Sequence, residues 1–229
     1  GSRTFPFVAK STGIPLARIA ARLTMGDLLS DLNIPERQEE AVAVKAPVFP
    51  FIKLRGLDPA PGPEMKSTGE VMGSHKNAAA AYLKARMATE IPVPTHGGVY
   101  ITVKDSDKES IIPLAKSLKD MEFDLYATRG TAAILRERGG LEVNSAYRIA
   151  EQGSPDALDL MRDGKIQLII NTPTNSGGAV LDGNMMRRLA VELNIPFVTT
   201  LSGATMEVQA VAEMIKGLPE PRSLTIGTV

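Results

Sequence analysis

The sequence predicts an α/β protein whose parallel sheet is covered by helices on both faces, preceded by a region of different character. From about Lys108 onward, short apolar runs with strand character alternate with helical patterns, and such alternation is typical of β-α-β units with parallel strands. The composition agrees, because 229 residues with 43% hydrophobic side chains suit one large domain or one compact domain with an appendage.

Each element of this part is predicted from its apolar pattern and its flanking residues. The expected strands cover residues 98–103, 123–128, 141–144, 165–172, 195–200 and 223–226. The expected helices lie between or after them, over residues 108–121, 131–138, 155–162, 183–193 and 205–216. Right-handed crossovers would place the carboxyl end of every strand, and the loop that follows it, at one edge of the sheet.

The preceding residues follow a different pattern. Residues 6–29 hold a helical stretch with one apolar face, whereas residues 46–73 are crowded with proline and glycine and are expected to lack long regular elements. Residues 77–89 are rich in strong helix formers. Two prolines and two glycines in residues 91–98 should stop that helix. We therefore expect two domains, residues 1–91 and residues 92–229.

Charge and composition exclude several classes of protein. The 26 basic and 26 acidic residues balance, so no general nucleic-acid or membrane-surface binding is expected. The chain has no cysteine, and its two histidines, His75 and His96, cannot form a multi-histidine metal site. No apolar run is long enough for a membrane span and the start lacks signal-peptide features, which predicts a cytoplasmic location. Gly1-Ser2 is expected to be either a processed start or a cloning remnant.

The strongest local signal is a turn at residues 126–131, where a strand leads through Thr128, Arg129, Gly130 and Thr131 into a helix. Free amide groups at a helix start, two hydroxyls and a guanidinium together suit a phosphate group. The alternative is that Thr128 or Gly130 simply caps the helix.

A second polar loop, residues 171–178, follows the apolar run of the strand predicted at residues 165–172. It should emerge at the same sheet edge as the first turn. It contains Asn171, Thr172 and Thr174, and the two loops together can surround one ligand. An ordinary solvated connection is the alternative. Lys108 and Arg148 lie near predicted element ends and would add positive charge, although each can equally be a surface residue.

Three segments carry a resemblance to a known family: residues 6–13 (PFVAKSTG), 54–59 (LRGLDP) and 62–73 (GPEMKSTGEVMG). They are similar to the end of the second ATP-grasp unit of the carbamoyl-phosphate synthetase large chain, and the last run is highly specific. Residues 97–229 resemble that chain's carboxyl-terminal regulatory domain, whose three-layer, Rossmann-like fold is shared with methylglyoxal synthase.

The resemblance implies part of a longer chain that makes carbamoyl phosphate from bicarbonate, ammonia released from glutamine and two ATP, for arginine and pyrimidine synthesis. Its implied partners are the rest of the large chain, a glutaminase small chain and another copy of itself. ATP and Mg or Mn would bind outside this sequence, which is expected to need no cofactor or metal and to be noncatalytic alone. Arg3 matches an arginine of the family's phosphorylation site.

In the family, the regulatory domain binds a nucleoside monophosphate such as UMP or IMP. The matching positions are Lys108, Thr128, Thr131, Arg148, Asn171 and Thr172 or Thr174. Arg129 and Gly130 join them because they lie in the same turn. Thr199 matches a residue of ornithine-activated relatives, but Phe197 replaces their tyrosine, which argues against ornithine binding. The effector would act on the ATP-grasp unit through residues 91–98 and the Pro/Gly-rich segment.

Two other functions fit the same sequence. A free-standing lyase acting on dihydroxyacetone phosphate would use the same phosphate site and need a carboxylate base, for which Asp156 is the candidate. The catalytic histidine of methylglyoxal synthase has no counterpart between residues 171 and 186. The third possibility is a purely structural oligomerisation domain.

Overall fold

The computed structural model of the chain describes residues 3–34, 41–49, 67–173 and 178–221. Its larger part is a five-stranded parallel sheet in the order β5-β4-β3-β6-β7. The strands are β3 (Gly98–Thr102), β4 (Asp124–Thr128), β5 (Asn144–Ala146), β6 (Leu168–Asn171) and β7 (Phe197–Val198). The parallel sheet is therefore confirmed, and the strand expected at residues 223–226 lies outside the described residues.

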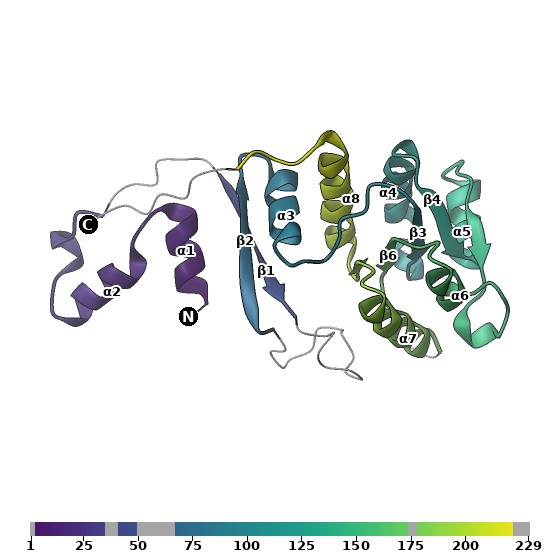
Figure 1. Cartoon of the computed structure of the whole chain (residues 1–229), viewed down its shortest axis with the longest axis horizontal. Coiled ribbons are helices and arrows are strands. Elements are labelled where there is room, and N and C mark those ends of the chain that lie inside the picture. Colours follow the sequence, from purple (N-terminus) through teal and green to yellow (C-terminus); the bar gives the residue numbers. More distant parts are fainter. Residues whose placement is uncertain (1–2, 35–40, 50–66, 174–177, 222–229) are drawn as a thin grey trace.

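Helices cover both faces of this sheet, which confirms the three-layer α/β class (Figure 1). They are α4 (Lys108–Asp120), α5 (Arg129–Glu137), α6 (Ala157–Arg162), α7 (Gly178–Glu192) and α8 (Leu201–Lys216), with short 3-10 turns η2 (Asp105–Asp107) and η3 (Ile149–Glu151) in the loops. The helix predicted to begin at residue 205 begins at Leu201, because the Thr200 hydroxyl accepts a hydrogen bond from the Gly203 amide at 3.0 Å and caps it.

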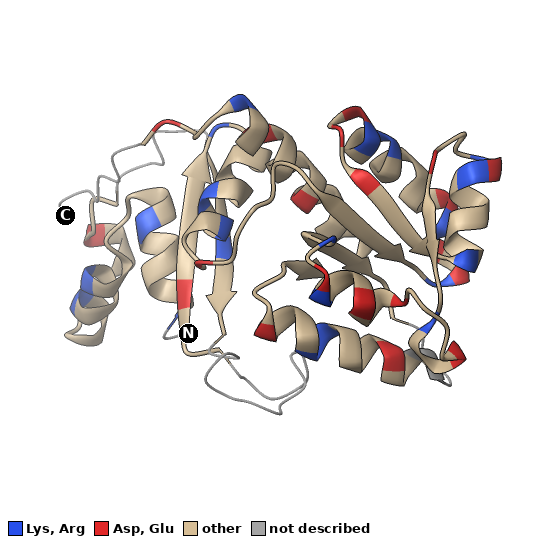
Figure 2. Cartoon of the chain, turned by 45° about the vertical axis from the view of Figure 1, so that its right-hand side comes forward, with Lys and Arg blue, Asp and Glu red and all other residues tan. Residues whose placement is uncertain are grey.

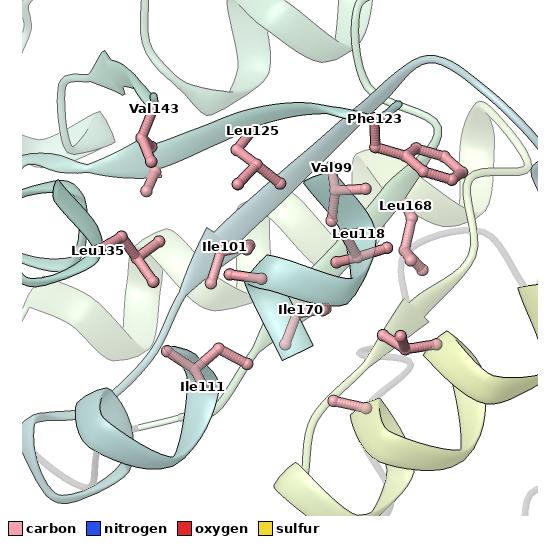
Figure 3. Packing of buried hydrophobic residues seen from close by; sticks show 14 of the residues in the cluster. Val99, Ile101, Ile111, Leu118, Phe123, Leu125, Leu135, Val143, Leu168 and Ile170 are labelled. Atoms are coloured by element: carbon pink, nitrogen blue, oxygen red, sulfur yellow. The ribbon is translucent and has the colours of Figure 1, made fainter. Parts of the chain in front are cut away.

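The apolar core is divided between the two faces of the sheet. On one face, α4, α5 and α8 pack over side chains such as Ile101, Leu125 and Ile170 (Figure 3). On the other, α6 and α7 pack over Tyr100 and Ile169. Adjacent residues of one strand thus enter opposite cores, as the alternation of side chains along a strand requires.

The preceding region agrees with its prediction in part. The helical stretch expected within residues 6–29 is confirmed as α2 (Leu16–Thr24), but a further helix, α1 (Thr4–Thr12), precedes it. Gly13 adopts a left-handed φ of 74° after α1, and Pro15 precedes α2. A 3-10 turn, η1 (Leu29–Asp31), follows. The Pro/Gly-rich stretch includes parts of two paired antiparallel strands, β1 (Val42–Val48) and β2 (Gly69–His75).

Helix α3 (Ala78–Met87) lies between this antiparallel pair and the larger sheet domain (Figure 1). Gly73 allows the helix to approach β2, since a Cβ atom there would lie 2.0 Å from the Ala81 carbonyl oxygen. The other side of α3 packs against α8. The helix therefore contacts both regions, whereas the domain boundary after it stays a prediction.

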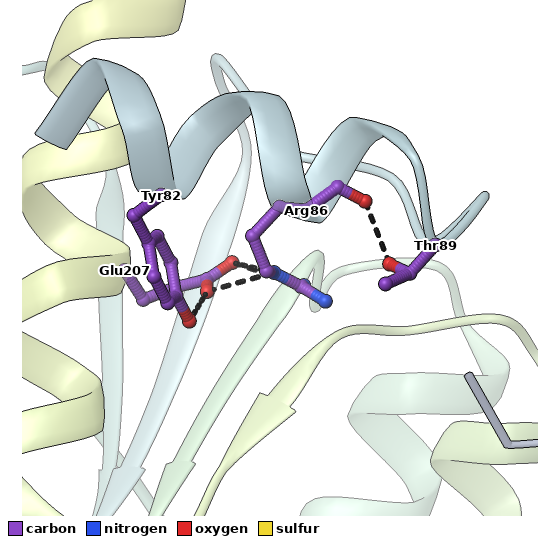
Figure 4. Close-up of polar contacts among 4 residues, drawn as sticks. All are labelled: Tyr82, Arg86, Thr89 and Glu207. Carbon is purple, nitrogen blue, oxygen red and sulfur yellow. Dashed lines mark hydrogen bonds and ion pairs between the residues drawn. The ribbon is translucent and has the colours of Figure 1, made fainter. Parts of the chain in front are cut away.

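A buried ionic cluster fastens α3 to α8 (Figure 4). Glu207 of α8 is 0% exposed and accepts hydrogen bonds from the Tyr82 hydroxyl at 2.9 Å and from Arg86 Nε at 3.0 Å. Arg86 Nη2 donates to the second carboxylate oxygen at 3.1 Å. Burial and the neighbouring carboxylate raise the pKa of Tyr82, so the phenol keeps its proton and remains a donor.

In the part of the chain that the structure describes, no helix has both the length and the apolar character needed to cross a membrane. Basic and acidic side chains are interspersed along the described helices, as the balanced composition suggests (Figure 2).

Candidate functional site

A cavity lies at the carboxyl edge of the sheet, where the loops after β3 and β6 leave toward opposite faces. Such a divergence opens a crevice between neighbouring strands, and ligands of open α/β sheets bind there. We call it the sheet-edge cavity; its volume is about 80 Å³. It is lined by these candidates from the sequence: Lys108, Thr128, Gly130, Thr131, Arg148, Asn171 and Thr172.

The N-terminus of α5 forms one wall. This helix begins at Arg129 and not at residue 131 as predicted, so Gly130 and Thr131 belong to its first turn. Thr128 occupies the N-cap position, but its side chain makes no capping hydrogen bond and instead contacts the Thr131 hydroxyl at 3.3 Å. Thr128 therefore does not cap the helix through its side chain, and Gly130 lies inside the first turn.

Lys108 stands where two helices begin. It is the first residue of α4, and a Cβ atom at Gly130 of α5 would lie only 3.2 Å from its Nζ atom. A cation at a helix N-terminus is electrostatically unfavourable, because that end already carries partial positive charge. The Asp105 carboxylate, 2.7 Å from Nζ, offsets part of this cost, and the hydrogen bond from Lys108 lowers the pKa of Asp105. A bound anion would offset the remainder.

The floor of the sheet-edge cavity comes from the end of β6. Asn171 and Thr172 are 7% and 4% exposed. The Thr172 hydroxyl accepts a hydrogen bond from the Lys104 amide at 3.0 Å. The backbone amide of Thr172 donates to the Thr102 carbonyl at 3.1 Å. These contacts join the loops after β3 and β6, so the floor is held by both strands.

Acidic residues also line the cavity, and the sequence pattern did not single them out as part of this site. Asp182 of α7 and Asp105 both belong to the lining. Desolvation raises the pKa of Asp182, against the opposing effects of a hydrogen bond from the Ala150 amide and of the nearby Arg148 charge. Asp182 and Met186 are four residues apart and therefore lie on the same face of α7, and both line the cavity. This spacing could have indicated a shared site only if the bounds of α7 had been known in advance.

Other predicted residues lie elsewhere. Arg129 pairs with Glu151 at 2.8 Å and stacks over the Tyr147 ring at 5.1 Å, and neither Arg129 nor Thr199 belongs to the described lining. Arg3 donates to the Ser67 hydroxyl at 2.8 Å in the preceding region. Thr174 lies outside the described residues.

Asp156, the candidate base of the lyase alternative, serves as the N-cap of α6. Its side chain accepts from the Asp159 amide at 2.9 Å, and the Asp159 carboxylate accepts from the Asp156 amide at 3.1 Å. It is also outside the described lining of the sheet-edge cavity. The geometry therefore does not favour the lyase.

The sequence of this chain is similar to those of known proteins. The MGS-like domain family matches residues 110–199. The carbamoyl phosphate synthase large chain of Methanothermobacter thermautotrophicus is 46% identical over 97% of this chain and 21% of its own length. The C-terminal section of that large chain in Methanopyrus kandleri is 45% identical over 94% of this chain and 40% of its own length.

A methylglyoxal synthase structure from Elizabethkingia anophelis matches with a TM-score of 0.44 and 16% identity, over 55% of this chain and 84% of that one. The chain spans less than half the length of each of these two synthase relatives. It is a homologue of the C-terminal section of carbamoyl phosphate synthase large chains and contains an MGS-like domain.

Proposed function

We propose that this chain binds a nucleoside monophosphate of the UMP or IMP type in the sheet-edge cavity. In a complete synthase, this binding would control ATP-dependent synthesis of carbamoyl phosphate for pyrimidine and arginine biosynthesis. The rest of the large chain and a glutaminase small chain would be its partners there, and ATP with Mg or Mn would bind in that remaining part. Residues 1–91 would complete an ATP-grasp domain, with Arg3 near its phosphorylation site.

The position of Lys108 carries this proposal. Its ammonium group, the first turn of α5 and the hydroxyls of Thr128 and Thr131 converge on one small space. Backbone amides at a helix start and a neighbouring cation are the groups that bind phosphate. The protein bears the electrostatic cost of this lysine, and a phosphate would relieve it.

The size of the cavity restricts which part of the ligand is enclosed. About 80 Å³ is well below the roughly 300–1,000 Å³ of sites that bury a whole drug-sized ligand. We therefore place the phosphate inside and the nucleoside at the mouth, where Arg148 and Asp182 are available. The Asp182 carboxylate accepts hydrogen bonds and suits a ribose hydroxyl.

Helices α8 and α3 supply an indirect connection from this site to the preceding region. Helix α8 follows β7, the neighbour of β6 at the cavity floor, and its Glu207 holds α3 through Arg86 and Tyr82. Helix α3 in turn packs on β1 and β2. We propose this rigid contact as the route of control, in addition to the linker at residues 91–98, since an effector acts by favouring one of two arrangements.

Isothermal titration calorimetry with UMP and IMP tests the proposed function. We expect saturable binding of at least one nucleotide, weakened at least tenfold by Thr131→Val, which removes a hydroxyl from the cavity. Thr205→Val is the matched control, because the Thr205 hydroxyl donates to the Leu201 carbonyl within α8. Absence of binding at millimolar nucleotide, or equal effects of the two variants, would overturn the proposal.

A further inference from the structure

Arg187 of α7 is buried directly behind the cavity floor. It is 5% exposed, and its Nη1 atom donates a hydrogen bond to Oδ1 of Asn171 at 3.1 Å. Its Nη2 atom donates to the side-chain oxygen of Asn184. A guanidinium cannot lose its proton in a protein, so a permanent positive charge lies beneath a residue that lines the cavity.

The two neighbours of the Asn171 amide determine its orientation. Arg187 has donors only, so the side-chain oxygen of Asn171 must face it. The Thr102 carbonyl has acceptors only, and Nδ2 of Asn171 donates to it at 3.4 Å. Among the described residues, the second N–H of that amide has no hydrogen-bond partner, and Asn171 lines the cavity. The amide therefore offers the ligand a donor.

Gly183 makes room for this contact. A Cβ atom at Gly183 would lie 2.9 Å from Nη1 of Arg187 and 3.5 Å from Oδ1 of Asn171. Glycine inside a helix lowers its stability relative to alanine. The chain nevertheless has glycine at this position of α7, where a methyl group would press on the guanidinium and disturb its bond to Asn171.

We infer that Arg187 is a positioning residue for the sheet-edge cavity, holding the Asn171 amide with its N–H directed to a hydrogen-bond acceptor of the ligand. This inference rests on the proposed function, because the ligand is the nucleotide bound there. The arrangement selects a phosphate oxygen or a base carbonyl at this point. It disfavours a donor, which would meet both the amide hydrogens and the positive charge behind them.

Titration calorimetry of four variants with UMP and with inorganic phosphate tests the inference. Asn171→Asp can keep the bond to Arg187 but loses the donor and adds a negative charge, so we expect at least tenfold weaker binding of UMP. Arg187→Met should weaken binding about tenfold, and Arg187→Lys, which keeps a donor, should restore most of the affinity. Gly183→Ala should weaken binding several-fold without lowering the melting temperature.

A purely structural role for Arg187 gives a different result. Arg187→Met and Arg187→Lys would then both lower the melting temperature while the folded protein kept wild-type affinity, which would overturn the inference. Wild-type affinity in Asn171→Asp or in Gly183→Ala would also overturn it, even if Arg187→Met failed to fold.

The two probes separate this inference from the proposed function. If the wild-type chain binds phosphate but neither UMP nor IMP, the nucleotide function fails, and the same variants measured with phosphate still decide the role of Arg187. If UMP binds and the variants behave like wild type, only the Arg187 inference fails. If the variants weaken the binding of phosphate as strongly as that of UMP, the acceptor is on the phosphate group. If only the binding of UMP is weakened, the acceptor is on the nucleoside.

Discussion

The α3–α8 contact and the sheet-edge cavity both concentrate charged side chains, but they satisfy them in different ways. Between the helices, Glu207 is fully buried and its carboxylate is bound by Tyr82 and Arg86 of the same chain. In the cavity, Lys108 and Arg148 surround open space at a helix start. Charges satisfied within the chain hold elements together, whereas charges gathered around a space at unfavourable cost indicate a ligand.

The largest effect is expected from Arg86→Met. It leaves the buried Glu207 carboxylate without its cation, and breaking a buried ion pair in this way costs about 3–5 kcal/mol. Denaturant unfolding should show this loss in the free energy of unfolding. The double variant Arg86→Met/Glu207→Met should recover much of it, because two apolar side chains replace the pair. A single variant as stable as wild type would show that the cluster does not hold the helices.

Lys108→Met should have the opposite profile, with a large effect on binding and little on stability. Charge-assisted hydrogen bonds contribute about 1.5–3 kcal/mol, so UMP affinity should fall by about tenfold to a hundredfold. The free energy of unfolding should change by at most about 0.5 kcal/mol, as is usual for surface substitutions. Calorimetry and denaturant unfolding measure the two quantities. Lys116→Met, at an exposed position of the same helix, is the control and should change neither.

Asp105→Asn should strengthen binding. The Asp105 carboxylate competes with the ligand for Lys108, but an exposed ion pair is screened by solvent and holds the lysine only weakly. Releasing the lysine should therefore raise the affinity for UMP by roughly 1.5-fold to fivefold. Unchanged affinity in calorimetry would mean that Lys108 does not bind the ligand, and weaker affinity would mean that Asp105 itself contributes to binding.

The sequence predicts the sheet and much of the cavity because both follow from local rules. Apolar runs mark β3, β4, β6 and β7, and the carboxyl ends of parallel strands meet at one edge, which brings Thr128 and Asn171 together. The strand expected at residues 141–144 begins only at Asn144, because the short edge strand β5 (Asn144–Ala146) has no apolar run. Helix starts were less accurate, because Thr200 and the first turn of α5 could not be distinguished from loop residues. The pattern therefore grouped Arg129 with the cavity, although its side chain turns to Tyr147.

Contacts between distant segments could not be predicted from one sequence. Glu207 and Arg86 are 121 residues apart, and each alone is an ordinary charged residue on a helix. Arg187 contacts the cavity floor only because α7 packs beside the end of β6, which brings its guanidinium to Asn171. Gly73, which is unremarkable in a Pro/Gly-rich stretch, is needed because α3 crosses it closely. In each case the physical cause is tertiary packing, which leaves no local pattern.

The smallest effect is expected at the loop that carries Arg148, and it should depend on pH. The hydrogen bond from the Arg148 amide and then the contact with Arg129 lower the pKa of Glu151. A carboxyl whose pKa is lower in the folded state stabilises the fold at pH values above its ordinary pKa of about 4.5. That stabilisation disappears as the pH falls through the lower, folded value. Glu151→Gln should therefore be less stable than wild type at pH 6, and the difference in unfolding free energy should shrink as the pH falls through the lowered pKa of Glu151.

Because Glu151 is exposed, this difference should be smaller than that of Arg86→Met at every pH, and Glu192→Gln, at an exposed end of α7, is the control. A constant difference between Glu151→Gln and wild type over the whole range would show that the carboxyl charge plays no part. A difference as large as that of Arg86→Met would contradict the distinction between the α3–α8 contact and the sheet-edge cavity. Charged side chains would then stabilise the loop beside the cavity as strongly as they stabilise the contact between the two helices.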